Sequence, residues 1–143
     1  MALNAKKIEL SILSPLHVVY KNEVDQVIIP TKDGEITLLP NHTPLVSALA
    51  DGEMLVQQAD GEKISFFIYG GVLEVRPDST VVVLTDESEL SSSISTEQAQ
   101  AAYDRAKQVA EEAKSRGDTD YSLLEAQMKK ELLRLHIGKK KRR

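Results

Sequence analysis

Residues 54–69 read MLVQQADGEKISFFIY, and this stretch decides the class of the fold. Two β-rich runs, Met54–Gln58 and Lys63–Tyr69, flank the dipeptide Asp60-Gly61. An Asp-Gly pair between two such runs is typical of a tight hairpin, because the turn favours residues that tolerate a positive φ. The sequence therefore predicts two antiparallel strands joined by a short turn.

The same pattern extends to both sides of this hairpin, from Lys7 to about Thr85. Ile8, Leu10 and Ile12 alternate with polar residues, which is the period of a half-buried strand. Further β-rich runs cover residues 17–20, 24–29, 35–39, 45–49, 72–75 and 80–84. So many short strands with closely spaced turns indicate a sandwich or a barrel.

The pattern changes to a helical one after an acidic, serine-rich segment at residues 86–95. Ser95 with Gln98 fits a capping box and predicts a helix that opens at Thr96. Gly117 ends this helix, and Asp118 or Thr119 caps the next. The first apolar stripe comprises Ala99, Ala102, Tyr103, Ala106, Val109, Ala110 and Ala113, and the second comprises Tyr121, Leu124, Met128, Leu132 and Leu135.

We therefore divide the chain into four segments. They are a β-domain at 1–85, a linker at 86–95, an antiparallel two-helix hairpin at 96–137 and a basic tail at 138–143. Burial of the five alanine methyls of the first stripe stabilises the packed hairpin by about 4 kcal/mol at most, at ~0.8 kcal/mol per buried carbon. That is close to the few kcal/mol that separate exchangeable conformations, so a movable hairpin is physically plausible.

Composition excludes several classes of function. The chain has no cysteine, so disulfides, thiolate catalysis and cysteine-ligated metals are ruled out. The formal net charge is −4, and because the last five residues carry +5, the rest carries −9 and would repel nucleic acid. The first residues lack a signal-peptide core, and no apolar run reaches transmembrane length.

No catalytic or metal-binding constellation is found. The three histidines, His17, His42 and His136, lie far apart and lack a second ligand at helical spacing. The acidic residues at 86–89 are best interpreted as a solvated linker. Gly70-Gly71 is too short to cradle a phosphate and predicts a bulge or a close backbone approach.

Two motifs carry a family resemblance. The first is VDQVIIP at residues 24–30 followed by DGEITLLPNHTPL at 33–45, and the second is GGVLEV at 70–75 leading into TVVVL at 80–84. Both closely resemble signatures of the epsilon subunit of F-type ATP synthases, in the same order and over nearly the whole chain. The resemblance implies a sandwich of about ten strands followed by the helical hairpin.

The resemblance also implies a non-catalytic rotor subunit that binds a gamma-type central stalk subunit and the membrane ring. In many bacteria the family's hairpin extends along the stalk, reaches the catalytic beta-type subunits and restrains ATP hydrolysis. The location implied is the cytoplasmic face of a bacterial plasma membrane, through the complex alone, with a thylakoid membrane as the alternative. No cofactor is expected, and the coupling ion, proton or sodium, stays open.

Two residues are candidates for partner contact. Glu35 matches the family's acidic position at the base of the sandwich, where it would accept charged hydrogen bonds from basic loops of the ring. An ordinary exposed turn glutamate is the simpler alternative. His42 lies between Asn41 and Thr43-Pro44. Two interpretations of it remain equally open: contact with the ring or stalk, and stabilisation of its own loop.

The chain departs from the family's nucleotide-binding motif. Ser95 and Gln98 stand where ATP-binding members have aspartate and arginine, and Leu123 and Lys130 stand where arginines are expected in the second helix. A triphosphate would lack its bidentate guanidinium partners. The sequence therefore predicts that this hairpin does not bind ATP with useful affinity.

The basic tail, Lys139, Lys140, Lys141, Arg142 and Arg143, has three interpretations. It is disordered by default, or touches anionic lipids, or contacts acidic segments of the catalytic subunits when the hairpin extends. We favour disorder in the compact form and acidic contacts in the extended one.

Two other functions are alternatives for the whole chain, a free-standing sugar-binding sandwich and a small hydrolase. The absence of tryptophan and of a nucleophile–base arrangement disfavours them.

Overall fold

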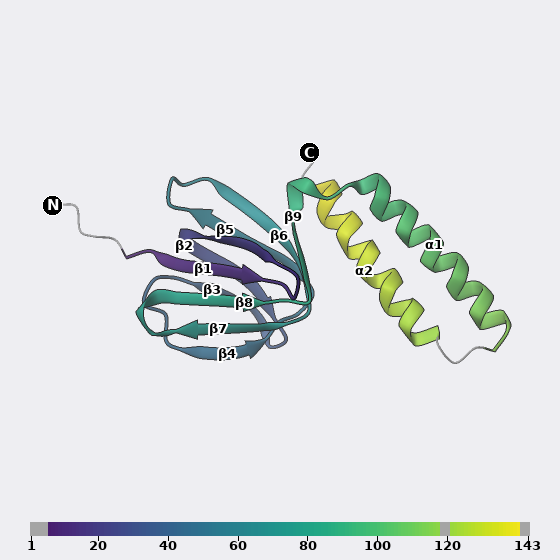
Figure 1. The fold of residues 1–143 in the computed structure, drawn as a ribbon, viewed down its shortest axis with the longest axis horizontal. Helices are drawn as coiled ribbons and strands as arrows, with labels where there is room; N and C mark the ends of the chain where they lie inside the picture. The colour runs from purple at the N-terminus through teal and green to yellow at the C-terminus, as the bar shows by residue number, and fades with distance from the viewer. Residues whose placement is uncertain (1–5, 118–120, 141–143) are drawn as a thin grey trace. The chain divides into compact units, whose positions relative to one another are not determined.

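The structure is a computed structural model that describes residues 6–117 and 121–140. The chain divides into two compact units, residues 1–90 and 91–143, which are described separately. The first unit contains the β-strands and the second contains the two long helices (Figure 1).

Within the described residues the first unit is a β-sandwich of nine strands, which confirms the expected class and the expectation of about ten strands. In chain order the strands are β1 (Ile8–Leu13), β2 (Val18–Thr31), β3 (Gly34–Leu38), β4 (Leu45–Ala48), β5 (Gly52–Gln58), β6 (Lys63–Tyr69), β7 (Val72–Arg76), β8 (Thr80–Leu84) and β9 (Glu87–Leu90). Their hydrogen-bonded order is β4-β7-β8-β1-β2-β5-β6-β9, and β3 pairs with β2. All pairs are antiparallel except β1 with β8.

Strand β2 corresponds to two of the expected β-rich runs. The two runs expected at 17–20 and 24–29 form one strand, because the polar residues between them continue to pair with β1. A register shift between Val24 and Gln26 marks the point where β2 passes from pairing with β1 to pairing with β3 and β5. Such irregularities are the usual way for one strand to join two packed layers.

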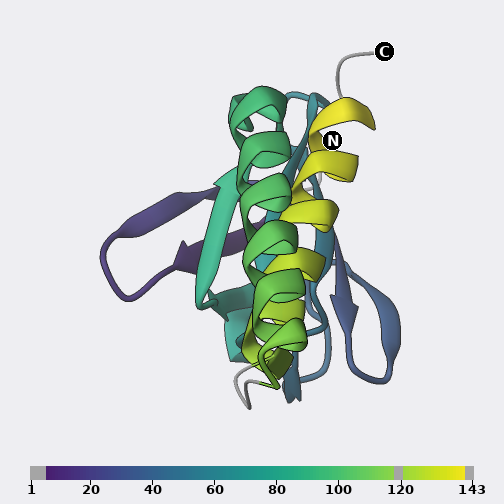
Figure 2. The ribbon, with the colours of Figure 1, turned by 90° about the vertical axis from the view of Figure 1, so that its right-hand side faces the viewer.

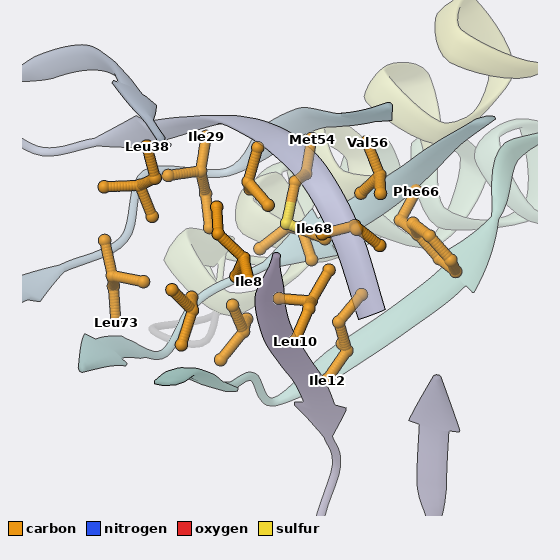
Figure 3. Packing of buried hydrophobic residues seen from close by; sticks show 14 of the residues in the cluster. Ile8, Leu10, Ile12, Ile29, Leu38, Met54, Val56, Phe66, Ile68 and Leu73 are labelled. Atoms are coloured by element: carbon orange, nitrogen blue, oxygen red, sulfur yellow. The ribbon is translucent and has the colours of Figure 1, made fainter. Parts of the chain in front are cut away.

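The core of the sandwich is aliphatic, as the composition predicts (Figure 3). Ile8, Leu10 and Ile12 are completely buried, so the alternating pattern of β1 identified its inner face correctly. Phe66 also lies in this cluster and its ring centroid is 5.1 Å from that of Tyr20. Burial of each such side chain contributes roughly 1.5–3 kcal/mol to the free energy of unfolding.

The close backbone approach predicted at Gly70-Gly71 is confirmed. Gly71 has a φ of +115°, and a Cβ placed on it would lie 2.7 Å from Cα of Thr85 and 2.9 Å from the carbonyl carbon of Leu84. Any side chain at this position would therefore collide with backbone atoms rather than with a flexible neighbour. Glycine is needed here for space and for φ together.

The second unit is a helical hairpin, with α1 (Thr96–Ser115) and α2 (Tyr121–Lys140) lying side by side (Figure 2). The Ser95 hydroxyl accepts a hydrogen bond from the backbone N–H of Gln98 at 3.2 Å, which confirms the predicted N-cap. Gly117, with a φ of +69°, follows the last turn of α1 as expected. The caps proposed at Asp118 and Thr119 lie outside the described residues.

Three details of the hairpin differ from the sequence analysis. Val109 and Leu132, assigned to the apolar stripes, are 45% and 50% exposed, whereas the stripe residues Ala106, Ala110 and Leu135 are buried. Gly138 does not end α2, which continues to Lys140. It is buried, and a Cβ there would lie 3.0 Å from side-chain methyls of Ile94 and Thr96, so its role is close packing.

The segment expected to be an unstructured linker is also ordered. It contains strand β9, which pairs with β6, and the short 3-10 helix η2 at Ser91–Ser93. The acidic character of Glu87 and Glu89 hid this strand, because pairing with an existing sheet overrides weak intrinsic β propensity.

Candidate functional site

The exposed outer surface of the sandwich carries the features that are suited to partner binding. Glu35 is exposed beside the β2–β3 turn, directly opposite Pro30 in the strand register. The turn itself is held by the Thr31 hydroxyl, which donates to the carbonyl of Gly34 at 2.6 Å and accepts from the N–H of Asp33 at 3.2 Å. Glu35 thus stands on a short, internally bonded hairpin.

His42 lies in the β3–β4 connection and is half-buried. Its Nδ1 is 2.7 Å from the carbonyl oxygen of Thr43, and its backbone N–H donates to Leu39. The loop is fixed further by Asn41, which has a φ of +66° and whose N–H donates to the Ser79 hydroxyl at 2.7 Å. The bond to Thr43 fits the loop-stabilising interpretation of His42, and contact with the ring or stalk stays a prediction. Leu39, which bonds to His42 through the backbone, is 53% exposed.

An apolar row crosses the outer face of five neighbouring strands, β4, β7, β8, β1 and β2. The strand register places Ala48 opposite Val72, Val72 opposite Leu84, Leu84 opposite Leu13 and Leu13 opposite Val18. Paired residues lie on the same side of a sheet, so these five side chains form one line. We call this line the apolar row.

The apolar row is substantially open to solvent. Val18 is 58% exposed, Leu84 is 47% exposed and Val72 is 41% exposed. A groove of about 340 Å³ runs along part of the row and is lined by Leu13, Ser14, Pro15, Gly71, Val72, Leu84, Thr85 and Asp86. At the adjoining end of the β1–β2 hairpin, Leu16 is 92% exposed.

Charged residues occupy the far end of the same face. On β7, Arg76 Nε lies 2.8 Å from a carboxylate oxygen of Glu74. The hydrogen bond from Arg76 holds the pKa of Glu74 below its usual value, and the bond to Glu74 raises the pKa of Arg76. The face therefore grades from charged to apolar, a layout typical of a protein–protein contact with a polar rim.

The positions that correspond to a nucleotide motif lie on the helical hairpin. Ser95 is committed to capping α1, and Gln98 is exposed on the first turn. On α2, Leu123 is 71% exposed and Lys130 is half-buried. Leu123 and Lys130 are seven positions apart along α2, about 10 Å at 1.5 Å per residue. None of the four supplies a guanidinium group.

The basic tail is described only in part. Lys139 and Lys140 form the last residues of α2, where positive charge interacts favourably with the helix dipole. Lys139 lines a shallow groove of about 410 Å³ together with Glu97 and Asp104 of α1. Lys141, Arg142 and Arg143 lie outside the described residues.

Comparison with known proteins decides the family. The model of the "ATP synthase, Delta/Epsilon chain, beta-sandwich domain" matches residues 7–91, more than half of the chain. The ATP synthase epsilon chain of Desulforamulus reducens is 43% identical over 104 residues, covering 73% of this chain and 77% of that protein. The chain belongs to the ATP synthase epsilon family.

Other members of the epsilon family extend the match through the helices. The epsilon chain of Caldanaerobacter subterraneus is 35% identical over 135 residues, 94% of this chain and 96% of its own length. In three dimensions the chain is similar to one in the mitochondrial ATP synthase of Euglena gracilis, solved as an OSCP/F1/c-ring assembly. That match has a TM-score of 0.67 and 23% identity, covers 97% of this chain and 82% of the other, and bears on the fold alone.

The epsilon family assignment confirms the resemblance seen in the two motifs and displaces the sugar-binding and hydrolase alternatives. Neither helix in the described part of the chain is long and apolar enough to cross a bilayer. Within residues 6–117 and 121–140, no three histidine, aspartate or glutamate side chains are grouped as metal ligands would be.

The apolar row was missed by the sequence analysis. Strand β8 reads TVVVL, in which apolar residues follow one another and conceal which side chains face inward. The signal was the absence of alternation itself, because a strand that is apolar on both faces is usually covered on both faces.

Proposed function

We propose that this epsilon-type chain is a non-catalytic rotor subunit. It couples the membrane ring of an F-type ATP synthase to the catalytic head through the central stalk, and its helices restrain ATP hydrolysis. The observation that carries the proposal is the exposed apolar row across β4, β7, β8, β1 and β2, because a contiguous apolar patch rimmed by charges marks a binding surface.

The proposed occupant of the apolar row is a gamma-type stalk subunit. Five strands at about 4.8 Å spacing give a row roughly 19 Å long. A helix of about 13 residues covers that length at 1.5 Å per residue. A long stalk helix laid across the strands would therefore meet every residue of the row, with Leu16 at one end.

The proposed contacts with the membrane ring lie at the start of β3 and in the β3–β4 connection. Glu35 is exposed there and would accept hydrogen bonds from basic groups of the ring loops. Leu39 adds an exposed apolar side chain in the β3–β4 connection. His42, which is bonded to its own loop, would act by holding that loop in shape.

The proposed role of the helical hairpin is regulatory and does not involve nucleotide. Its basic C-terminus, from Lys139 onward, would meet acidic segments of catalytic beta-type subunits. With Ser95 used as a cap and no guanidinium at positions 98, 123 and 130, ATP should not bind. Isothermal calorimetry on the whole chain checks this, and micromolar binding would contradict it. The complex is expected at the cytoplasmic face of a bacterial plasma membrane, or at a thylakoid membrane.

The deciding experiment compares ATP hydrolysis by the cognate catalytic complex reconstituted with the full chain or with a form ending at Leu90. The truncation removes the second unit and keeps all nine strands. Faster hydrolysis with the truncated form is expected if the helices restrain the enzyme. Equal rates with both forms bound would remove the regulatory role, and failure of both to bind would remove the rotor role.

A matched pair of variants tests the apolar row. Val72→Asp places a charge in the row, and Thr37→Asp places the same charge on an exposed position of β3 outside it. Affinity for the stalk subunit should fall about tenfold or more with the first variant, because a charge in an apolar contact is left without a partner. If both variants bind equally well, the row is not the stalk surface.

A further inference from the structure

Strand β9 is an edge strand of the sandwich, as β4 is at the other end of the sheet. It has four residues, Glu87–Leu90, it pairs with β6 alone, and it is the last strand in the hydrogen-bonded order of the sheet. None of its residues is fully buried. A short strand bonded along one edge opens more readily than one bonded on both sides, such as β5 between β2 and β6.

The inner face of β9 breaks the pattern of the core. In the register with β6, Ser88 is opposite Ile68 and Leu90 is opposite Phe66, so both point to the side of the apolar core. Leu90 packs against that core. The Ser88 hydroxyl is buried there and has no hydrogen-bond partner among the described residues.

A second orphaned hydroxyl follows immediately after the strand. Ser91, the first residue of η2, is 2% exposed, and its hydroxyl also lacks a partner within the part of the chain that the structure describes. Leaving a buried hydroxyl unpaired weakens the state that buries it. Both hydroxyls lie where the sandwich ends and the helical segment begins, so both of these costs fall on this short stretch of chain.

Thr85, two residues before β9, is in contrast firmly held. Thr85 is 4% exposed and its N–H donates to the carbonyl of Leu13 on β1 at 2.9 Å. Its hydroxyl lies 3.1 Å from the carbonyl oxygen of Tyr69, 2.9 Å from that of Gly70 and 2.9 Å from that of Glu87. Only the last of these partners belongs to β9, so Thr85 keeps its other bonds when β9 detaches.

We propose that β9 is a releasable strap, in which residues 87–90 detach from β6 while Thr85 keeps the rest of the sandwich closed. Release converts four ordered residues into a tether of up to about 13 Å between the sandwich and the helical hairpin. The unpaired Ser88 hydroxyl sets the ease of release. The regulatory consequence rests on the proposed function, because it assumes that the helices act on the catalytic head.

The test is amide hydrogen exchange of the isolated full chain, read by mass spectrometry. In the wild type, the segment 87–90 should exchange at least about tenfold faster than β5. Ser88→Ala removes the unpaired hydroxyl and should slow exchange of that segment on the order of tenfold, without changing β5. Exchange of β9 as slow as that of β5, or an unchanged rate in Ser88→Ala, would overturn the strap.

Ser65→Ala is the matched control. Ser65 is a buried serine on β6, but its hydroxyl donates to Glu53 at 2.9 Å, so its removal should not slow exchange in β9. Equal slowing by both alanine variants would show a general effect of alanine and refute the role of Ser88.

Hydrolysis assays then separate the strap from the proposed function. With the Ser88→Ala chain in the catalytic complex, a tighter strap should hinder the helices and give faster ATP hydrolysis than the wild type. If exchange behaves as expected and truncation at Leu90 leaves hydrolysis unchanged, the strap stands and the regulatory function fails. If truncation accelerates hydrolysis and the exchange results fail, the function stands and the strap falls.

Discussion

Replacing Gly71 by alanine should be among the most damaging single-methyl changes in the sandwich. The added Cβ would lie 2.7 Å from Cα of Thr85 and 2.9 Å from the carbonyl carbon of Leu84, and both are backbone atoms of neighbouring chain. Relief therefore requires β7 and β8 to separate. The φ of +115° adds strain for any residue with a side chain.

The magnitude follows from two separate costs. An unfavourable backbone conformation for a residue other than glycine costs about 1–3 kcal/mol, and forcing an extra carbon into a packed site costs about 1–3 kcal/mol more. Gly71→Ala should thus lower the free energy of unfolding by roughly 2–6 kcal/mol. Gly61→Ala is the control, since Gly61 has a φ of +88° but no atom within 4 Å of the added Cβ, so only the first cost applies.

Urea unfolding of the full chain followed by circular dichroism measures the difference between these variants. Gly71→Ala should be less stable than Gly61→Ala by about 1–3 kcal/mol, the part that comes from the collision alone. If the two variants unfold at the same urea concentration with the same slope, the close approach of Gly71 to Leu84 and Thr85 does not constrain the fold and the reasoning is refuted.

Three further predictions concern other parts of the chain. Ser95→Ala should cost about 1 kcal/mol of helix stability by removing the N-cap of α1, and thermal melts of the helical signal measure it. Leu10→Ala should cost about 2–5 kcal/mol in chemical denaturation, whereas Leu16→Ala, at a 92% exposed site, should stay within about 0.5 kcal/mol. Because the pKa of Glu74 is lowered in the folded chain, its pairing with Arg76 stabilises above the unfolded-state pKa and is lost as pH falls through the folded one. A Glu74→Gln chain should therefore lose less stability than the wild type on acidification, by a small amount at this exposed pair.

Local rules predicted the elements whose causes are local. The hairpin around Asp60-Gly61, the alternating strand β1 and the Ser95 cap each depend on residues within a few positions of one another. Gly61 has the positive φ that its turn requires, and Ser95 bonds the N–H three residues ahead. In each case the sequence contains both partners of the interaction.

Elements decided by distant contacts were predicted poorly. Strand β9 consists of Glu87, Ser88, Glu89 and Leu90, a composition that does not favour a strand, and it exists because β6 offers an edge to pair with. Gly138 was interpreted as a helix end because glycine often has that role. Its actual neighbours, Ile94 and Thr96, are more than forty positions away and their approach cannot be read from local pattern.

The candidate contact residues show the same difference between features with local causes and features decided by distant contacts. The turn that presents Glu35 follows from Asp33-Gly34, and the structure has that turn with Glu35 exposed. Whether Glu35 touches the ring stays a prediction. The apolar row could not be foreseen, because it depends on the register of five strands, two of which, β1 and β8, lie about seventy residues apart in the chain.

The two faces of strand β8 give the reason to expect a partner on the apolar row. Its inward residues, Val81 and Val83, are covered by the core of the sandwich at 1% and 0% exposure. Two of its outward residues, Val82 and Leu84, are also apolar, and Leu84 remains 47% exposed while Val82 is 8% exposed. Polar residues suit the solvated face of an antiparallel sheet, and a strand that is apolar on both faces normally belongs between two layers. The chain supplies one of these layers in its own sandwich, and under the proposed function the stalk subunit supplies the other.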